Sequence, residues 1–190
     1  EFEQELIILS DFILSRSTRI AVDELTAAIR YAVASVEADM NSTLCAHGNE
    51  NSIALVRDES LACEGYEVSV EAGQVTLAYA DDLGAVYGLY DLSERYLGVT
   101  PFDFWNERSP QGVDQVAIPE GTYASPSRAV KYRGWFVNDE VMLDGWPDSE
   151  SEKVDMWCRI YETILRAGGN MVIPGTDRKD DGEQLCGIAL

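Results

Sequence analysis

The segment that most constrains the fold is residues 131–140, where an apolar run leads directly into polar side chains. Residues 135–137 suit a buried strand, and Asn138, Asp139 and Glu140 follow them without a break. In a (β/α)8 barrel the catalytic groups lie at this C-terminal end of the strands. Acidic side chains are rarely buried without partners. Two carboxylates and an amide at this place therefore indicate either a helix-capping turn or a polyol-binding and acid–base site.

The residues that follow continue in the order strand, helix, strand, helix. Ser149 and Glu152 have the spacing of a capping box, and Gly168 can take the left-handed conformation that ends a helix. Residues 171–173 are a second short apolar run, and residues 181–190 suit another helix. Such alternation predicts parallel strands joined by right-handed crossovers. The apolar face of the first helix consists of Val154, Trp157, Ile160, Tyr161, Ile164 and Leu165.

Several short motifs occur in order along this region: Tyr132-Arg133-Gly134, Phe136, Asn138-Asp139-Glu140, Leu165-Arg166, Asn170 and Pro174-Gly175. Together they resemble the start of the catalytic barrel in glycoside hydrolase family 115, whose members are α-glucuronidases acting on glucuronosyl side groups of xylan. Residues 65–99 resemble the small α/β domain that precedes the barrel in this family and in several other glycosidase families. Where that family has a tryptophan-rich stretch after the second strand, this chain has Gly-Thr-Asp-Arg-Lys-Asp at 175–180.

The resemblance implies a function and roles for four residues. The full-length enzyme would hydrolyse glucuronosyl groups with inversion, one carboxyl group protonating the leaving oxygen and another activating a water. Glu140 is the catalytic candidate, as a sugar ligand or a proton-transfer group, and Asn138 and Asp139 would shape the pocket. Arg133 is a candidate for binding the uronate, and its alternative role is that of a buried partner for Asp139. No metal and no cofactor are expected, and the expected partner is a glucuronoxylan-type oligosaccharide.

Two other functions stay open at the level of the sequence. The chain could be a non-catalytic α/β module for carbohydrate binding or oligomerisation, or it could belong to another glycosidase family that shares the accessory domain. The retaining hexosaminidases share that domain, but their Asp-Glu pair comes from a later barrel strand than the one here. A complete barrel takes roughly 250 residues, and only about 60 follow Tyr132, so we expect a truncated barrel that is inactive alone. Its unpaired strand edges favour burial of residues 133–190, either by self-association or by folding back on the N-terminal domain.

The expected fold is therefore α/β, with an accessory domain at 1–98, a Pro- and Gly-containing connector at 99–130 and the first β/α units of a truncated (β/α)8 barrel at 131–190. The accessory domain should be a mixed sheet with two helices on one face. Its expected strands are residues 6–9 and 53–56 and the hairpin 66–79. The first helix has the apolar stripe Val22, Leu25, Ile29, Val33, Val36 and Met40. The second runs from a cap at Asp81 or Asp82 to Gly98, and Gly84 and Gly88 indicate close approach of that helix to the sheet.

The charge and the cysteines limit the possible partners. The chain has 34 acidic and 14 basic residues, a net charge of −20, which makes nucleic acid a poor partner because its phosphates would be repelled. Binding a uronate anion in such a field requires local cations, for which Arg133 and Arg178 are candidates. No apolar run has the length of a membrane span. The four cysteines form no CxxC pair. Reduced thiols would suit a bacterial cytoplasm, whereas a Cys45–Cys63 bridge would suit a secreted protein.

Overall fold

The computed structural model describes residues 11–137, 143, 145 and 149–173, and the chain forms two compact units. Within the described residues the first unit consists of 11–99 and 109–126. The second consists of 100–108 together with the residues from 127 onward. The expected strand at 6–9 and the expected helix at 181–190 lie outside the described residues.

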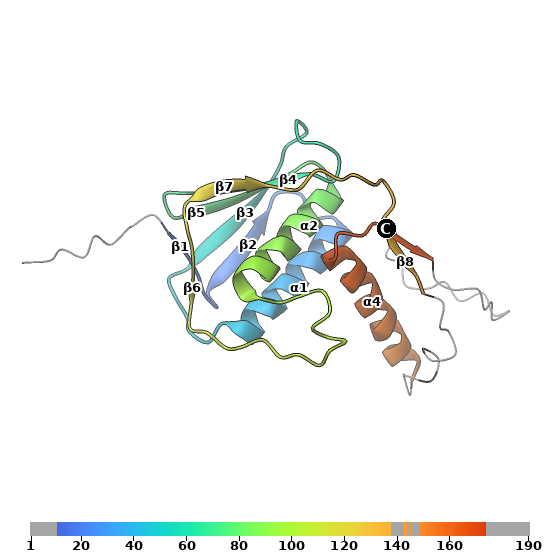
Figure 1. Ribbon diagram of the computed structural model, residues 1–190. Coiled ribbons are helices and arrows are strands. Elements are labelled where there is room, and N and C mark those ends of the chain that lie inside the picture. The colour runs from blue at the N-terminus through green and yellow to red at the C-terminus, as the bar shows by residue number, and fades with distance from the viewer. Residues whose placement is uncertain (1–10, 138–142, 144, 146–148, 174–190) are drawn as a thin grey trace, which may run out of the picture. The chain divides into compact units, whose positions relative to one another are not determined.

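The first unit is built on a five-stranded mixed sheet (Figure 1). The strands in spatial order are β2 (Thr18–Val22), β3 (Asn51–Arg57), β5 (Gln74–Tyr79), β4 (Tyr66–Glu71) and β7 (Gly121–Ala124). β2, β3 and β5 are parallel, and β4 runs antiparallel to both of its neighbours. A separate antiparallel pair joins β1 (Phe12–Leu14) to β6 (Val116–Ile118). The mixed α/β fold predicted from the sequence is confirmed.

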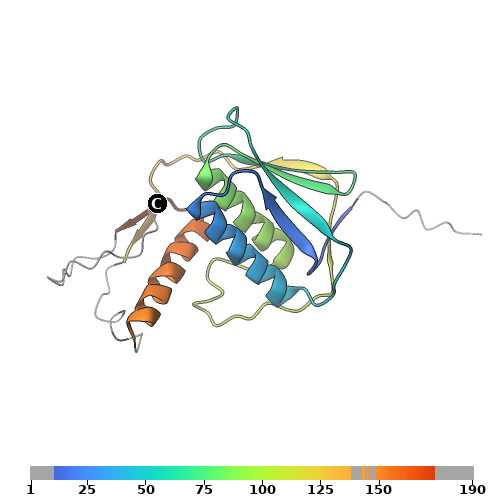
Figure 2. The ribbon, with the colours of Figure 1, turned by 180° about the vertical axis from the view of Figure 1, so that it is seen from behind.

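Two helices cover one face of this sheet, α1 (Ala27–Thr43) and α2 (Asp82–Leu92), as Figures 1 and 2 both show. Burial alternates along the strands, so the inner face carries the core and the outer face is polar or small. A short π-helical turn, η1 (Ser93–Leu97), continues α2, and Ser93 donates a 2.6 Å hydrogen bond to the Asp39 carboxylate of α1. The fully buried core residues on the strands include Ile53, Leu55, Val68, Val70, Val75, Leu77 and Tyr79.

The hairpin predicted at 66–79 is present, with β4 and β5 joined by a two-residue turn. Both turn residues have positive φ, 48° for Ala72 and 71° for Gly73. Positive φ at both central positions is what a type I′ turn requires. Ala72 adopts this conformation as well as Gly73 because the register between Glu71 and Gln74 leaves only two residues to reverse the chain.

The expected apolar stripe of the first helix is wrong at its beginning. Val22 is the last residue of β2, and Leu25 is exposed. Thr26 caps the helix, because its side chain accepts a hydrogen bond from the Ile29 backbone N–H at 3.4 Å. Apolar residues spaced three apart occur in a helix, and they also occur where a strand ends in a turn. The position of the N-cap residue therefore decides where the helix begins. The residues that α1 buries are Ile29, Ala32, Val36, Met40 and Thr43.

The second helix begins and ends where the sequence predicts. The Asp81 side chain accepts a hydrogen bond from the Gly84 N–H at 2.9 Å, and Gly98 ends the π-helical turn with φ of 69°. Gly84 and Gly88 allow the close approach that was expected of them. A Cβ on Gly84 would overlap the Gly65 carbonyl, and one on Gly88 would lie 2.8 Å from the Leu77 side chain of β5.

The second unit contains a strand–helix–strand element made of β8 (Gly134–Phe136), α4 (Glu150–Arg166) and β9 (Met171–Ile173). β8 and β9 are parallel, as predicted. Ser149 caps α4 by accepting from the Glu152 N–H at 3.3 Å, and Gly168 ends it with φ of 74°. The expected apolar face of α4 needs one correction, since Val154 is exposed and Met156 is buried in its place.

The segment expected to connect the two domains contributes structure to both units. Residues 100–108 belong to the second unit, and residues 109–126 return to the first. β6 and β7 lie in this returning part and pair with β1 and β4. Their short length, three and four residues, gives too little alternation for a strand to be recognised from sequence.

Candidate functional site

The candidate site is the C-terminal edge of the β8–β9 pair. The strands pair in register from Gly134 with Met171 to Phe136 with Ile173, and the Val137 N–H donates to the Ile173 carbonyl at 2.8 Å. Parallel strands joined by a helix expose their C-terminal ends at the same edge, where ligands bind in open and closed α/β sheets. Asn138, Asp139 and Glu140 follow β8 in the sequence and lie outside the described residues, so their roles stay predictions.

The two faces of this strand pair differ in what covers them. Val137 and Val172 pack against the buried face of α4, which consists of Met156, Ile160, Tyr161 and Ile164. Phe136 and Ile173 are partners in the ladder and therefore point to the same, opposite face. Their side chains are 49% and 45% exposed. One face of β8–β9 is thus covered by α4, and the other is open within the described residues.

Arg133 lies at the N-terminal end of β8, so the three residues of that strand separate it from the edge where residues 138–140 follow. Its guanidinium donates to backbone carbonyls, from Nε to Gly168 at 2.8 Å and from Nη1 to Val130 at 2.8 Å. Asn170 completes the contact, accepting from the Arg133 N–H at 2.9 Å and donating to the Lys131 carbonyl at 2.8 Å. These contacts favour a structural role for Arg133, which holds the start of β8 against the end of α4.

Gly134 explains why the motif around Arg133 contains glycine. A Cβ at this position would overlap the Met171 backbone carbonyl of β9. The strands can therefore approach only when residue 134 has no side chain. Asn170, Arg133 and Gly134 form one structural unit that fixes the register of the two strands, although Asn170 stands in a different motif of the sequence from the other two.

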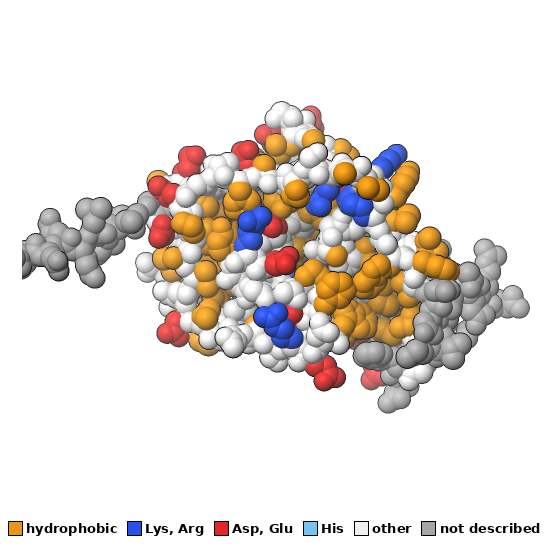
Figure 3. Space-filling model, viewed as in Figure 1, with side chains coloured by type: hydrophobic (Ala, Val, Ile, Leu, Met, Phe, Trp, Pro, Cys, Tyr) orange, Lys and Arg blue, Asp and Glu red, His pale blue; other side chains and the backbone are white. Residues whose placement is uncertain are grey.

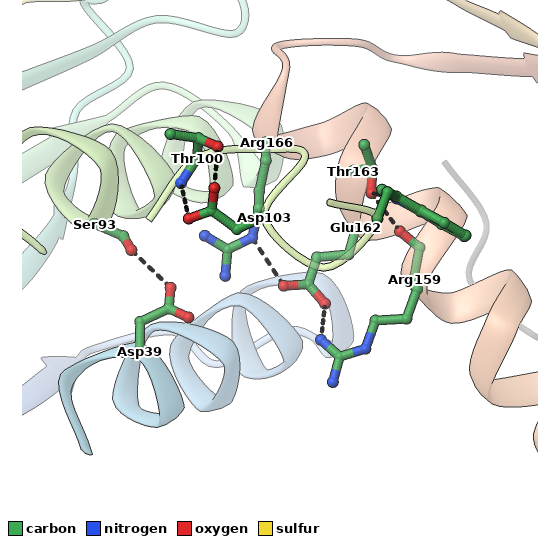
Figure 4. Close-up of polar contacts among 9 residues, drawn as sticks. Asp39, Ser93, Thr100, Asp103, Arg159, Glu162, Thr163 and Arg166 are labelled. Atoms are coloured by element: carbon green, nitrogen blue, oxygen red, sulfur yellow. Dashed lines mark hydrogen bonds and ion pairs between the residues drawn. The ribbon is translucent and has the colours of Figure 1, made fainter. Parts of the chain in front are cut away.

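A buried ion-pair cluster on α4 was not predicted from the sequence (Figure 4). The Glu162 carboxylate accepts from Arg166 Nε at 2.8 Å and from Arg159 Nη1 at 3.1 Å. Glu162 and Arg166 both have only 7% of their side-chain surface exposed. The signal for this cluster is the i, i+3 and i, i+4 spacing of opposite charges on one helix. This carboxylate has two guanidinium partners and lies on α4, not at the strand ends.

The loop at 100–108 packs on α4 through side-chain hydrogen bonds (Figure 4). Trp105 Nε1 donates to Thr163 Oγ1 at 2.7 Å, and Thr163 Oγ1 donates to the Arg159 carbonyl at 2.7 Å. Within the loop, the buried Asp103 carboxylate accepts from both the N–H and the hydroxyl of Thr100, at 3.0 and 2.5 Å. Trp105 thus attaches the loop to α4 within the second unit.

Where the structure describes them, the cysteines and acidic groups form no metal-binding arrangement. Among the described residues, no cluster of three or more His, Cys, Asp or Glu side chains could hold a metal ion. Cys45, Cys63 and Cys158 are free thiols, so the alternative of a Cys45–Cys63 bridge is not realised. The hydrogen bond to Asp81 raises the pKa of Cys63, which keeps this thiol protonated and a weak nucleophile. The helices within the described ranges include none long and apolar enough to cross a membrane.

Comparison with known proteins agrees with the resemblance found in the sequence. The model of glycosyl hydrolase family 115 matches residues 125–184, which include the whole β8–α4–β9 element. A solved family GH115 4-O-methyl-α-glucuronidase with specificity for decorated arabinogalactans has a TM-score of 0.68 at 21% identity, covering 85% of this chain and 25% of that one. The family match thus covers the part of the chain from residue 125 to residue 184, and the likeness to the solved enzyme concerns the fold. Among curated proteins, no sequence matches.

Enzymes of a second family share the fold. A GH20 exo-β-N-acetylglucosaminidase from Vibrio harveyi has a TM-score of 0.57 at 12% identity, covering 85% of this chain and 22% of that one. A chitobiase from Flavobacterium johnsoniae has a TM-score of 0.56 at 15% identity, covering 85% and 24%. The chain thus spans about a quarter of the length of the solved GH115 and GH20 enzymes. The fold is common to both families, and the sequence match distinguishes GH115.

Proposed function

We propose that this chain is the N-terminal part of a family 115 glycoside hydrolase that removes glucuronosyl or 4-O-methylglucuronosyl groups from xylan. The observation that carries the proposal is the family match over 125–184, which coincides with a parallel strand pair whose first strand leads into Asn138, Asp139 and Glu140. In the proposal, residues 1–98 are the accessory domain and residues 131–190 begin the catalytic (β/α)8 barrel.

In this proposal the chemistry takes place at the C-terminal ends of the barrel strands. Glu140 binds the glucuronosyl group or assists proton transfer, and Asn138 and Asp139 shape the pocket around the sugar hydroxyls. Inverting hydrolysis needs two carboxyl groups on opposite sides of the sugar, roughly 6.5–9.5 Å apart. The second group would come from another strand of the longer protein, and no metal or cofactor takes part.

The uronate carboxylate needs a cationic partner in this pocket. Arg133 is poorly placed for it, because its donors face the Gly168 and Val130 carbonyls at the other end of β8. We therefore assign Arg133 to the structure of the strand pair. The uronate-binding cation would come from elsewhere in the longer protein, with Arg178 as the candidate within this chain.

The proposal is tested in the longer protein that contains this chain. Glu140→Gln should lower turnover on aldouronic xylo-oligosaccharides by at least about a hundredfold with unchanged thermal stability, because general acid–base groups contribute roughly 10²–10⁴-fold. Glu94→Gln, the same change at an exposed position of η1, should leave turnover unchanged. Unchanged turnover in Glu140→Gln would leave only a structural role for this residue.

The choice of polysaccharide is tested in the same assay. Xylan is the proposed substrate, and the solved GH115 relative is specific for decorated arabinogalactans. Release of glucuronate from an arabinogalactan side chain but not from glucuronoxylan would support the proposed reaction and contradict the proposed substrate. Release of N-acetylglucosamine from chitobiose would instead place the chain with the GH20 enzymes. Sugar binding without release of any monosaccharide by the longer protein would favour the non-catalytic module.

A further inference from the structure

We propose that the first unit carries a second carbohydrate site, for a uronate-bearing saccharide, at the N-terminal ends of β2 and β3. A hollow of about 400 Å³ lies there, lined by polar side chains. Its volume falls in the range of small-molecule sites, roughly 300–1,000 Å³. The choice of a uronate as ligand rests on the proposed function. The lining residues are Ser17, Arg19, Glu50, Asn51 and Ser52.

The strand register brings these side chains together. β2 and β3 lie side by side at one edge of the sheet (Figure 1), with Thr18 opposite Asn51 and Arg19 opposite Ser52. Thr18 is buried, and its exposed neighbour Arg19 alternates to the other face of the sheet at this edge strand. Ser52, its partner in the ladder, points the same way. The hollow is therefore built by two strands at an open corner of the sheet.

The Arg19 guanidinium has hydrogen-bond donors that no carboxylate among the described residues occupies. Its Nη1 makes two long hydrogen bonds, 3.4 Å to the Arg16 carbonyl and 3.3 Å to the Thr18 carbonyl, and no carboxylate within the described residues forms an ion pair with it. In contrast, Arg57 and Arg95 pair with acidic side chains at 3.0 and 2.7 Å. With 34 acidic residues in the chain, a guanidinium without a carboxylate partner among the described residues is available for an external anion.

A smaller hollow adjoins the first. It has a volume of about 100 Å³ and shares Arg19 with the first hollow. Arg16 and Glu37 line it as well, so two guanidinium groups and two carboxylates, those of Glu37 and Glu50, border the combined space. Planar guanidinium groups bind carboxylates with two parallel hydrogen bonds, and such charge-assisted bonds are about twice as strong as neutral ones.

The rest of the lining suits a polyol better than a simple anion. Asn51 is held in place because its Nδ2 donates to the Ile13 carbonyl at 2.8 Å. The hydroxyls of Ser17 and Ser52 can both donate to and accept from sugar hydroxyls, and the Glu50 carboxylate can accept from them. Glu50 also repels small inorganic anions, which carry no hydroxyl donors to offset the repulsion. Arg19 beside the neutral and acidic acceptors of the larger hollow thus matches a sugar that has a single carboxylate.

The test is calorimetric titration of the 190-residue chain with sodium D-glucuronate, D-glucose and sodium sulfate. Glucuronate should bind with a Kd on the order of 1–10 mM, as expected for a small polar ligand, and glucose should bind at least about tenfold more weakly because it lacks the carboxylate. The affinity for glucuronate should fall as salt rises. Arg19→Ala should weaken glucuronate binding by about tenfold or more. Glu50→Gln should raise the affinity for sulfate relative to glucuronate.

Arg30→Ala is the matched control, because it removes the same charge from an exposed position on α1 outside both hollows. It should change the affinity by less than about twofold. Equal binding of glucuronate by Arg19→Ala and the parent chain would overturn the site, and so would no binding at all. Sulfate binding as tightly as glucuronate would reduce it to an unselective anion site. Hydrolysis by the longer protein is measured separately, with Glu140→Gln, so the failure of either proposal leaves the other standing.

Discussion

At the scale of single residues, Arg133 shows how one side chain can fit two roles until its contacts are known. It stands in the motif that leads to Asn138, and its charge suits a uronate. In the structure its Nε and Nη1 donors meet carbonyls on both sides of the strand start. The two carbonyl groups belong to Gly168, which is 35 positions away in the chain, and to Val130, which is three positions away. The path of the chain from α4 back to β9 brings the Gly168 carbonyl to Arg133.

Replacement of Arg133 should therefore affect stability more than binding. Arg133→Ala should destabilise the second unit by about 1–2 kcal/mol, because the half-buried Gly168 carbonyl loses a charged donor, whereas the exposed Val130 carbonyl can bind water instead. Hydrogen–deuterium exchange of the β9 amides, which depend on this end of the ladder, should report the loss. Lys131→Ala, an exposed neighbouring cation, should leave their protection unchanged. Normal protection in Arg133→Ala would show that the guanidinium does not hold the strand pair.

Tyr123 on β7 makes the first unit sensitive to alkaline pH. Burial raises the pKa of its phenol above the usual range, and burial also raises the pKa of Tyr79. The unfolded chain loses these protons at about pH 10, before the folded chain does. Stability is therefore fully present below pH 10 and falls as the pH rises above it.

Tyr123→Phe should reduce this alkaline loss. Denaturant midpoints measured between about pH 8 and pH 11.5 should fall less steeply in the variant than in the parent chain. Tyr79 remains in the variant, so part of the decline should persist. Identical pH dependence in the two proteins would show that the Tyr123 phenol ionises equally in the folded and unfolded states.

At the scale of elements, the loop at 100–108 is attached to α4 by the Trp105–Thr163 hydrogen bond of 2.7 Å. The Thr163 hydroxyl is buried and serves both as acceptor for the indole and as donor to the Arg159 carbonyl. A single side chain thus links the loop to the helix through both of its hydrogen-bonding functions. The cation of Arg159 also lies over the Phe104 ring, 5.1 Å from its centroid.

Thr163→Val should release this loop from α4, because the substitution removes the hydroxyl group with little change in side-chain volume. The indole N–H of Trp105 would lose its partner, at a cost of about 1–3 kcal/mol for an unsatisfied buried donor. Tryptophan fluorescence should shift to longer wavelength as Trp105 gains contact with water, and trypsin should cleave after Arg108 more quickly. Thr163→Ser keeps the hydroxyl and should behave like the parent chain. Equal fluorescence and cleavage in the Val variant would mean that packing alone holds the loop.

At the scale of the whole molecule, apolar surface remains open in the second unit. Figure 3 shows hydrophobic side chains gathered at the right of the view, on the part of the molecule that holds α4. Phe136 and Ile173 face away from α4, and Trp135 is also partly exposed. In a closed barrel the neighbouring strands would cover the inner face of β8 and β9. Exposed edges and apolar patches of this kind promote association.

The 190-residue chain alone should therefore be inactive and should self-associate. It should release no glucuronate from glucuronoxylan oligosaccharides, because several strand ends contribute to barrel active sites. Light scattering should show species larger than a monomer, and Phe136→Ser combined with Ile173→Ser should shift them toward the monomer. Ile13→Ser combined with Val56→Ser changes exposed apolar residues of the first unit and serves as the control. Measurable hydrolysis, or a clean monomer with fast amide exchange in α4, would contradict these expectations.

Much of the fold could be predicted because its signals are local. The hairpin at 66–79, the caps at Asp81 and Ser149 and the stop at Gly98 follow from alternation and from side chains that satisfy nearby backbone groups. The parallel pairing of β8 and β9 follows from the strand–helix–strand order. Val22 and Leu25 were misassigned because a period of three to four residues continues past the true start of a helix when the cap is not taken into account. Val154 lies inside α4 but is exposed, and Met156 is buried in its place.

The sequence by itself determined the α/β class, the positions of most helices and the resemblance to family 115, because periodicity, capping and motifs depend on residues close together in the chain. The tertiary structure alone decided which side chains meet across the chain. It directed Arg133 to the Gly168 carbonyl, joined Trp105 to Thr163 and placed Arg19 beside Ser52. These contacts join residues 33 to 58 positions apart, and their partners are selected by strand register and helix packing, which no local pattern specifies.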